Sequence, residues 1–571
     1  MRVRLLPLLT CLLLCSALMV EAQAASLAQQ RQMYDEAKRA LAKGNRAPYQ
    51  LFEGALRNYP LEPYLAYDEL TGRLKQASNE EIEKFLAEHG DLPQIGWMKL
   101  RWLRWLTERG EWSTFADYYD PALNFTELDC LYGQYLFRAN LPVEANAQAQ
   151  KLWLVGKSQP EACDALFSQW QRSGGLTDEL RWQRAKLAAE AGQYGLASSL
   201  IRQLPGLTHK GQLLVEVAQK PQLLKQTGKF VPADRQMADV VGLGLRRMAR
   251  QNPEQAIEWL EFYGNRLPFS SEEKVAIARS IGLTLAKRFD ARALKVMAQY
   301  DPELRDNTVS EWRTRLLLRL GRWNEAHELT LKLPQELAST PRWRYWQARS
   351  LQLAQPQNPQ VPLLYAPVAN ERDIYGFMAA DQVKQSYQLN NRPLALDPKV
   401  MQKVRNTAGV RRAMEFHDRG QIVDGRREWY HVSRLFSREE LVAQARVAYE
   451  KQWYFPAIRT ISQAQYWDDL DIRFPMAYQS TLTREARNRN LHSSWVFAIT
   501  RQESAFMVDA KSPVGATGLM QLMPATAKET AKRYGIALSS PQQLINPNVN
   551  IQLGAAYLSQ LYNQFKGNRV L

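Results

Sequence analysis

Residues Arg315–Pro334 read RLLLRLGRWNEAHELTLKLP, a pattern that recurs over much of the chain. Apolar side chains return in it every three or four residues, which is the period of an amphipathic α-helix. Gly321 interrupts the pattern in the middle and Pro334 ends it. Glycine commonly closes a helix and proline stops one. The stretch therefore predicts two helices joined by a tight turn, a helical hairpin.

The same hairpin pattern returns in several segments of the first two-thirds of the chain. It appears in residues 39–56, 103–119 and 184–205, which turn at Gly44, Gly110 and Gly192. A single hairpin cannot bury its apolar face alone, so successive hairpins are expected to stack into a solenoid. Alternating strand patterns are scarce. We therefore predict an all-α protein with a long α-superhelix over residues 25–389.

Two further domains are predicted after the superhelix, because a chain of 571 residues has room for about three to four. The proline-bearing stretch that begins at Asn390 marks the first boundary. Residues 390–473 carry more amphipathic helices and form a helical linker domain. Pro475 then breaks the helical pattern, which places a last domain at residues 474–571.

The N-terminus predicts export. Two arginines precede a short apolar run, and an A-x-A cleavage site follows at Ala22 and Ala24. We interpret residues 1–24 as a cleaved signal peptide, which leaves no predicted transmembrane segment. Lipidation of Cys15 is the weaker alternative, since leucines rather than a small residue precede it.

The cysteine content and the net charge indicate which covalent link, ligands and binding partners the protein can have. Signal cleavage leaves two of the four cysteines, Cys130 and Cys163, which are expected to form a disulfide in an oxidising compartment. Neither cysteines nor histidines have metal-ligand spacing, so no metal or cofactor is predicted. The net charge of +16 favours an anionic polymer, and no zinc-finger or RNA-reading motif points to nucleic acid. A solvated basic face without a dedicated partner is the alternative.

One carboxylate in the last domain is placed for acid–base chemistry. Residues 491–506 predict a helix that begins near Ser493 and Ser494. Glu503 shares one face of this helix with Val496, Ile499 and Phe506. Apolar surroundings raise the pKa of a carboxyl group, as a general acid near neutral pH requires. The alternative is a helix-end glutamate that points to solvent.

The segment after this helix is suited to hold a sugar. Residues 512–524 contain Gly515 and Gly518, which permit tight backbone geometry and the close approach of a ligand. Gln521 carries a donor and an acceptor, as an acetamido group requires. Neighbouring methionines form adaptable apolar walls. Together these residues predict a helical cleft that binds a sugar polymer.

Three motifs give this domain a family resemblance. They are ESAF at 503–506, SPVGATGLMQLMPATA at 512–527 and N-P-x-x-N-I-x-L-G-x-x-Y-L at 546–558. In this order they resemble the soluble lytic transglycosylases of bacterial cell walls, and the whole layout resembles the large periplasmic members. The resemblance implies a periplasmic, monomeric enzyme. It also implies a U- or ring-shaped superhelix, a linker domain and a lysozyme-like catalytic domain.

The resemblance also implies the chemistry. Such enzymes cleave the β-1,4 bond between N-acetylmuramic acid and N-acetylglucosamine of peptidoglycan during cell-wall turnover. They are lyases that leave 1,6-anhydromuramyl ends. Glu503 would act first as acid and then as base, so one carboxylate suffices. Ser504, Ser512, Gln521 and Met523 would bind the glycan strand, and other cell-wall enzymes are candidate partners.

Two alternatives stay open at this point. The family continues with an A-Y-N-A-G-x-G segment, whereas this sequence ends in KGNRVL, so the catalytic domain is expected to be incomplete. The chain would then be a non-catalytic helical scaffold that binds peptidoglycan or proteins. A hydrolase of lysozyme type would need a second carboxylate, for which Asp509 is the nearest candidate; the family pattern makes Asp509 a loop residue.

Overall fold

The computed structural model describes residues 25–569, so the predicted signal peptide at residues 1–24 lies outside the described residues. Within 25–569 the regular elements are helices, and extended pairing is limited to two isolated bridges around Thr517. The all-α prediction is confirmed. In the same range, no helix combines the length and the apolar character needed to cross a membrane.

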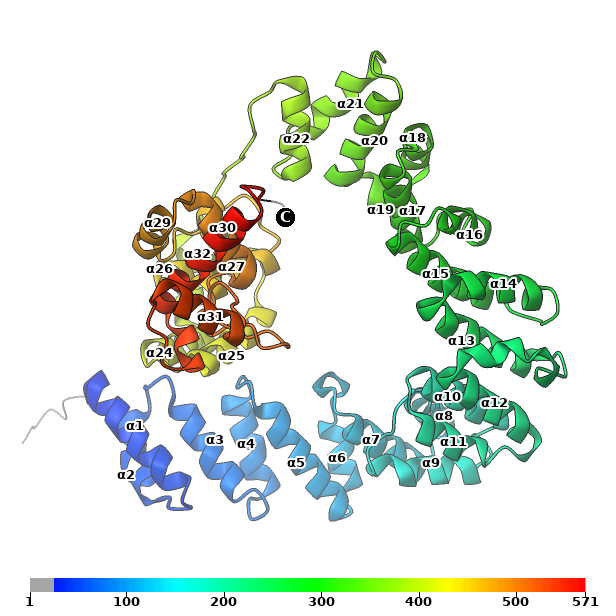
Figure 1. Cartoon of the computed structure of the whole chain (residues 1–571). Helices are drawn as coiled ribbons and strands as arrows, with labels where there is room; N and C mark the ends of the chain where they lie inside the picture. Colours follow the sequence, from blue (N-terminus) through cyan, green and yellow to red (C-terminus); the bar gives the residue numbers. More distant parts are fainter. Residues whose placement is uncertain (1–24, 570–571) are drawn as a thin grey trace, which may run out of the picture. The chain divides into compact units, whose positions relative to one another are not determined.

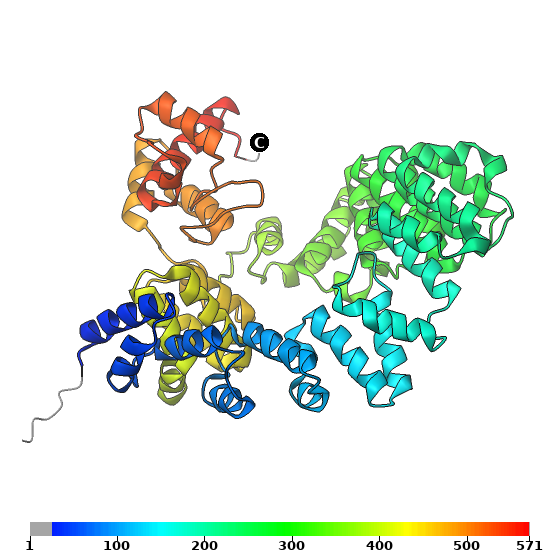
Figure 2. The same cartoon turned by 90° about the horizontal axis from the view of Figure 1, so that it is seen from below.

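Residues Leu103–Asn390 form one compact unit of helical hairpins. Within it, helices pack on the next helix and often on the next but one, as the pairs α7–α8, α7–α9 and α13–α15 show (Figures 1 and 2). This stacking is the predicted solenoid. The elements, with η for 3-10 helices, are α6 (Trp112–Tyr118), η1 (Pro121–Leu123), α7 (Thr126–Arg138), α8 (Pro142–Trp153), α9 (Ala162–Arg172), α10 (Asp178–Glu190), α11 (Tyr194–Ile201), η2 (Pro205–Leu207), α12 (Thr208–Gln219), η3 (Pro221–Lys225), η4 (Thr227–Lys229), α13 (Arg235–Gln251), α14 (Pro253–Gly264), α15 (Ser271–Lys287), α16 (Arg292–Tyr300), α17 (Asn307–Arg319), α18 (Trp323–Lys332), α19 (Gln335–Ala338), α20 (Pro341–Ala354), α21 (Gln360–Val368) and α22 (Ile374–Val383).

The predicted glycine turns join these helices. Gly321 stands between α17 and α18 with φ +69°, a left-handed conformation that glycine adopts without steric cost. The N–H of Arg322 donates to the carbonyl of Leu317 at 3.0 Å, which closes the end of α17. Gly44, Gly110 and Gly192 also have positive φ. The hairpin prediction is therefore confirmed at its turns.

The predicted disulfide joins two helices of this unit. Cys130 on α7 and Cys163 on α9 are fully buried, and their sulfur atoms are 1.95 Å apart. Trp153 and Trp170 pack in the same hydrophobic cluster. The bond thus fastens α7 to α9 inside the core rather than at the surface.

The other compact unit combines the two ends of the described chain, up to Trp102 and from Asn391 onward. No local sequence pattern predicts this grouping. Domain boundaries near residues 390 and 474, and a U- or ring-shaped arrangement, stay predictions. Its elements are α1 (Leu27–Leu41), α2 (Ala47–Leu56), α3 (Glu62–Gly72), α4 (Asn79–His89), the first half of α5 (Ile95–Glu108), α23 (Pro398–Asn406), α24 (Ala408–Asp418), α25 (Ile422–Val432), η5 (Ser433–Leu435), α26 (Arg438–Glu450), α27 (Tyr454–Gln463), α28 (Leu470–Arg473), α29 (Gln479–Asn488), α30 (Ser493–Ser504), α31 (Pro524–Tyr534), η6 (Pro541–Ile545) and α32 (Pro547–Gln564).

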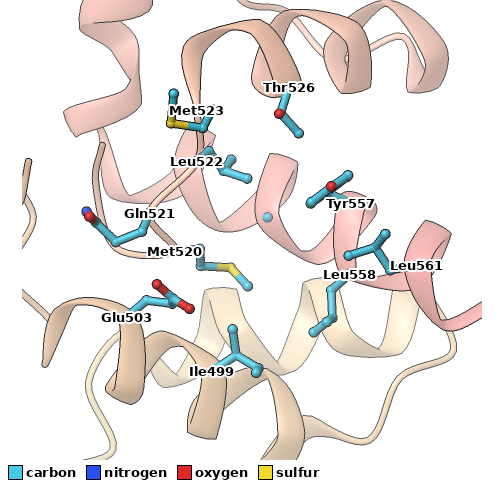
Figure 3. A pocket seen from close by; sticks show the side chains of 11 residues that line it. Ile499, Glu503, Met520, Gln521, Leu522, Met523, Thr526, Tyr557, Leu558 and Leu561 are labelled. Atoms are coloured by element: carbon cyan, nitrogen blue, oxygen red, sulfur yellow. The ribbon is translucent and has the colours of Figure 1, made fainter. Parts of the chain in front are cut away.

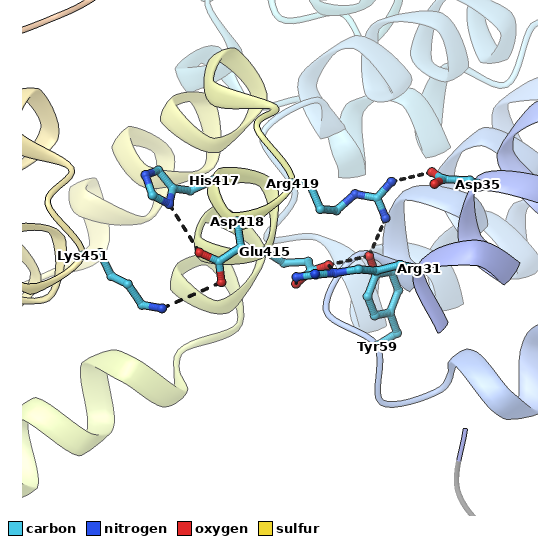
Figure 4. A network of polar contacts seen from close by, with 8 residues as sticks. All are labelled: Arg31, Asp35, Tyr59, Glu415, His417, Asp418, Arg419 and Lys451. Carbon is cyan, nitrogen blue, oxygen red and sulfur yellow. Dashed lines mark hydrogen bonds and ion pairs between the residues drawn. The ribbon is translucent and has the colours of Figure 1, made fainter. Parts of the chain in front are cut away.

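A network of polar contacts joins α1 and the α2–α3 turn to α24 (Figure 4). The guanidinium of Arg31 donates to both oxygens of Glu415, at 2.7 and 2.8 Å. The Tyr59 hydroxyl donates to the same carboxylate at 2.8 Å and accepts from Arg419 at 2.9 Å. Arg419 also pairs with Asp35. The first helices are therefore held by charged groups far along the chain.

A second, deeper contact lies at Glu428 on α25. Its side chain is fully buried and accepts from Nε of Arg412 at 2.6 Å and from the hydroxyl of Tyr64 at 2.8 Å. Arg412, only 3% exposed, also donates to the Asp91 carboxylate at 2.8 Å. A buried charge is tolerated only when it is paired and hydrogen-bonded. Tyr64, Asp91, Arg412 and Glu428 form such a set, which we call the buried ion cluster.

Candidate active site

Helix α30 carries Glu503 in its last turn. The helix begins at Ser493 as predicted, but His492 rather than a serine is its N-cap. It ends at Ser504 because Ala505 and Phe506 both have left-handed backbones, with φ of 49° and 64°. This conformation is costly for residues other than glycine and is concentrated at functional sites. The chain therefore turns sharply directly after Glu503.

Ser504 holds this turn together. Its hydroxyl donates to the carbonyl of Thr500 at 3.1 Å and accepts from the N–H of Phe506 at 3.1 Å. The side chain is buried and is not among those that line the cavity beside Glu503. Ser504 thus fixes the end of α30, and its predicted substrate contact stays a prediction.

Arg501 anchors the same helix on its other side. Its Nε donates to the carbonyl of Arg473 at 2.9 Å, and its guanidinium lies 5.7 Å from the ring centre of Phe474. Burial, and then the charge of Arg473, lower the pKa of Arg501 from its ordinary value. The C-terminal half of α30 is therefore fixed to the end of α28 and to the residue that follows it.

A cavity of about 340 Å³ lies beside Glu503, between α30, the loop after it and α32 (Figure 3). It is mostly apolar, and Glu503 is the single carboxylate among the described residues that line it. The structure brings three predicted residues together here, namely Glu503, Gln521 and Met523. The other lining residues are Ile499, Met520, Leu522, Thr526, Gly554, Tyr557, Leu558 and Leu561.

The surroundings of Glu503 differ from the prediction. Its side chain is exposed in the cavity rather than enclosed by apolar neighbours. The reason is the left-handed turn, which takes Phe506 off the helix face. Phe506 is buried elsewhere, with its ring centre 6.5 Å from that of Tyr454. Val496 points into the core, so only Ile499 of the predicted stripe shares the cavity with Glu503.

Ser512 shapes the loop that follows. Its N–H donates to the carbonyl of Ala516 at 2.8 Å, and its hydroxyl accepts from the N–H of Ala516 at 3.0 Å. Ser512 closes this five-residue turn and is not among the residues that line the cavity. Its predicted substrate contact stays a prediction, and in this structure the hydroxyl oxygen accepts from the backbone.

Asn550, which the sequence analysis missed as a site residue, fastens the loop to α32. It is fully buried, donates to the carbonyls of Thr517 and Leu544 at 3.0 and 2.9 Å, and accepts from the N–H of Met520 at 2.8 Å. A Cβ atom at Gly518 would lie 2.2 Å from the Asn550 amide. Gly518 thus permits the approach of the protein's own side chain rather than of a ligand. Asn550 is the second asparagine of the third sequence motif, and its place in that motif could have identified it as a site residue.

Gln521 lies at the end of this loop, and of its side-chain amide only the NH2 group makes hydrogen bonds within residues 25–569. Its φ is +45°, and its NH2 group donates to the carbonyls of Ala510 and Gly518 at 3.2 and 3.0 Å. Within residues 25–569 its carbonyl oxygen has no hydrogen-bond donor. The loop therefore presents an oriented acceptor at the cavity, beside the 40% exposed side chain of Met523.

Asp509, the candidate second carboxylate, is held by a neighbouring helix. Arg426 on α25 donates to both of its oxygens, at 2.8 and 2.6 Å. Asp509 does not line the cavity. A bidentate pair of this kind fixes geometry as well as charge. Asp509 therefore positions the loop between α30 and α31, as expected of a loop residue.

Replacing Asp509 tests this assignment. We expect Asp509→Asn to lower kcat/KM by about 3- to 10-fold on peptidoglycan, the substrate that the motif resemblance implies, because the charge-assisted pair with Arg426 is weakened and the loop loosens. Loss of an acid–base group would cost about 100-fold or more. Asp424→Asn is the control, since Asp424 lies on α25 and pairs with the exposed Arg427. A 100-fold loss confined to Asp509→Asn would make Asp509 catalytic.

Comparisons with known proteins bear on the whole chain. A family model described as the Transglycosylase SLT domain matches residues 480–571, and one described as the Soluble lytic murein transglycosylase L domain matches residues 403–470. The soluble lytic murein transglycosylase of Escherichia coli K12 is 30% identical over 573 residues, covering 99% of this chain and 87% of the relative. The chain belongs to the soluble lytic murein transglycosylases. The resemblance drawn from the three motifs is confirmed.

Other soluble lytic transglycosylases give the same result. The Salmonella typhimurium protein is 30% identical over 96% of this chain and 85% of its own length. The structure of the lytic transglycosylase Slt inactive mutant E503Q from Pseudomonas aeruginosa has 68% identity and a TM-score of 0.92, over 94% of this chain and 88% of that one. The 70 kDa enzyme of Escherichia coli has 28% identity and a TM-score of 0.80, over 96% and 88%. A cucumovirus coat protein model also matches residues 134–219, a stretch of helical hairpins that carries no functional conclusion here.

Proposed function

We propose that this lytic transglycosylase cleaves peptidoglycan in the cavity beside Glu503. The bond broken is the β-1,4 bond between N-acetylmuramic acid and N-acetylglucosamine, and the product carries a 1,6-anhydromuramyl end. One observation carries the proposal: Glu503 is the single carboxylate among the described residues that line the cavity. The inactive mutant of the Pseudomonas aeruginosa relative, E503Q, supports a glutamate as the essential group. The scaffold alternative is not favoured.

A single carboxylate can complete this reaction. Protonated Glu503 donates its proton to the glycosidic oxygen as the bond from that oxygen to C1 of the muramyl residue breaks. The carbonyl oxygen of the muramyl 2-acetamido group stabilises the positive charge at C1. The carboxylate then takes the proton of the C6 hydroxyl while O6 bonds to C1. Glu503 returns to its starting state and no water is consumed, so the second carboxylate of an ordinary glycosidase is unnecessary.

The remaining lining residues are suited to position the sugar. The free carbonyl oxygen of Gln521 can accept the N–H of an acetamido group, and the NH2 group that already bonds the loop keeps it oriented. Met520, Met523 and Leu558 supply apolar walls. A bound strand would cover the exposed Glu503 and exclude water, which favours attack by the C6 hydroxyl over hydrolysis.

The products of sacculus digestion test the proposed function. Purified sacculi are incubated with the full chain, and the released muropeptides are analysed by mass spectrometry. We expect anhydromuramyl ends, which are 18 mass units lighter than reducing ends because water is not added. Reducing ends would show a hydrolase, and the absence of products would support a non-catalytic scaffold.

Export is part of the proposed function. The predicted signal peptide at residues 1–24 and the peptidoglycan substrate support a periplasmic enzyme that acts as a monomer on glycan strands, with other cell-wall enzymes as further partners. Sequencing the N-terminus of the exported protein checks the cleavage site. A mature chain that begins at Ala25 agrees with it, and a retained Met1 contradicts it.

A further inference from the structure

A second pocket lies in the unit of residues Leu103–Asn390, in a different compact unit from Glu503. Its volume is about 420 Å³, and α17, α20 and α22 form it. We call it the arginine–aromatic pocket. Its lining residues are Arg315, Leu318, Arg319, Arg342, Trp343, Trp346 and Tyr375. None of them is acidic, and the catalytic proposal uses none of them.

The pocket carries more positive than negative charge. Glu311 is paired with two of its arginines, since Arg315 and Arg342 both donate to the same carboxylate oxygen at 2.8 Å. Arg319 is exposed and makes no ion pair with any residue in the range 25–569, although its guanidinium lies 4.8 Å from the ring centre of Phe289. Two guanidinium groups therefore share one carboxylate and the third has none, so these three arginines and Glu311 together carry two excess positive charges. An arginine fork matches the geometry of a carboxylate ligand.

Aromatic rings lie beside these charges. Trp343 is buried, whereas Trp346 and Tyr375 are half-buried and keep part of their surface accessible. The guanidinium of Arg342 lies 5.7 Å from the ring centre of Tyr375, which in turn packs 5.7 Å from that of Tyr345. The rings are thus held in place by their neighbours. Rigid aromatic surface next to fixed donors is how proteins bind amphipathic ligands such as sugars.

We propose that the arginine–aromatic pocket binds a peptide-bearing muramyl unit of a peptidoglycan strand. The carboxylates of the peptide would pair with Arg319 and Arg342, and an apolar face of the sugar would lie on Trp346 or Tyr375. The proposal rests on the proposed function for the identity of the polymer. It adds an anchoring site that is separate from the catalytic cavity, so that a strand can stay bound after a cut.

Binding to an inactive full-length chain tests the pocket. The parent carries Glu503→Gln to stop turnover, and it is titrated by calorimetry with the disaccharide GlcNAc–MurNAc-tetrapeptide. We expect two sites. Adding Arg319→Gln and Arg342→Gln should weaken one site by at least about fivefold, since two charge-assisted hydrogen bonds are lost. The matched control is Arg322→Gln, because Arg322 is exposed, pairs with Glu325 and lies outside the pocket. It should keep both sites.

Two results would overturn the proposal. One is a single binding site in the parent; the other is a double variant that binds as the control does. Uncharged chitotetraose should occupy the catalytic cavity only, so equal binding of chitotetraose at both sites would also contradict a carboxylate-reading pocket. If the double variant unfolds early, Arg319→Gln alone serves, because Arg319 has no ion pair and loses only its contact with the exposed ring of Phe289. These readouts measure binding, so a failed cleavage test and a failed pocket are told apart.

Discussion

Glu503→Gln is expected to lower the rate of sacculus cleavage by at least about 100-fold while the fold and glycan binding stay close to those of the parent. The amide has nearly the same shape as the carboxylate but cannot exchange the proton that the reaction needs. The structure adds a reason for an intact fold. The side chain of Glu503 is exposed and its carboxylate makes no hydrogen bond with a described residue, so no buried partner is left unsatisfied.

The measurement is the release of anhydromuropeptides, followed by chromatography, together with the thermal midpoint of each variant. Glu529→Gln is a suitable control, since Glu529 is an exposed glutamate on α31 that pairs with Arg533 and does not line the cavity. It should keep the parent rate. A Glu503→Gln chain that retains more than about a tenth of the parent activity would rule out the acid–base assignment.

Arg412→Met is expected to destabilise the contact between α3 and α25 by about 3–5 kcal/mol. The methionine removes one partner of the buried ion cluster and leaves the fully buried Glu428 carboxylate with only the hydroxyl of Tyr64. An uncompensated buried charge is far more costly than a lost surface pair. Glu428→Leu in the same chain should recover most of the loss, because it removes that charge.

Hydrogen exchange of the α3 and α25 amides measures this effect locally, which suits a chain of more than one compact unit. Arg405→Met is the control, because Arg405 and Glu450 form an exposed pair whose loss should cost no more than about 1 kcal/mol. Equal protection in Arg412→Met and Arg405→Met would show that the buried ion cluster does not stabilise this contact.

Local sequence patterns predicted the local part of the fold. The three- and four-residue spacing around Gly321 identifies a hairpin because both the apolar period and the left-handed turn lie within twenty residues. No local sequence pattern indicates that Arg31 pairs with Glu415, 384 positions later. Charged residues at such a distance carry no periodic signal, so local patterns alone do not predict the grouping of the two chain ends.

The candidate site also combines residues that local motifs predict with backbone features that they do not predict. Glu503, Gln521 and Met523 are recognised because their motifs carry the chemistry, and the structure brings them to one cavity. Ser504 and Ser512 stand in the same motifs, and their hydroxyls bond the neighbouring backbone, so their substrate contacts stay predictions. The two left-handed residues after Ser504 break the helix face on which the expected burial of Glu503 depended. The residue types of Ala505 and Phe506 do not predict a left-handed backbone, which residues other than glycine rarely adopt.

The pairing of Arg31 and Tyr59 with Glu415 also sets the order in which parts of the chain can pack during synthesis. The partners are separated by 384 and 356 residues, so the first helices are synthesised well before the carboxylate that holds them. At 5–20 residues per second, the first interval lasts roughly 20–80 seconds. During that delay α1 to α3 can form but cannot complete their packing. The packing of the first helices can therefore be completed only after residue 415 has been synthesised. A nascent polypeptide stopped before that residue would leave Arg31 and Tyr59 without their carboxylate partner.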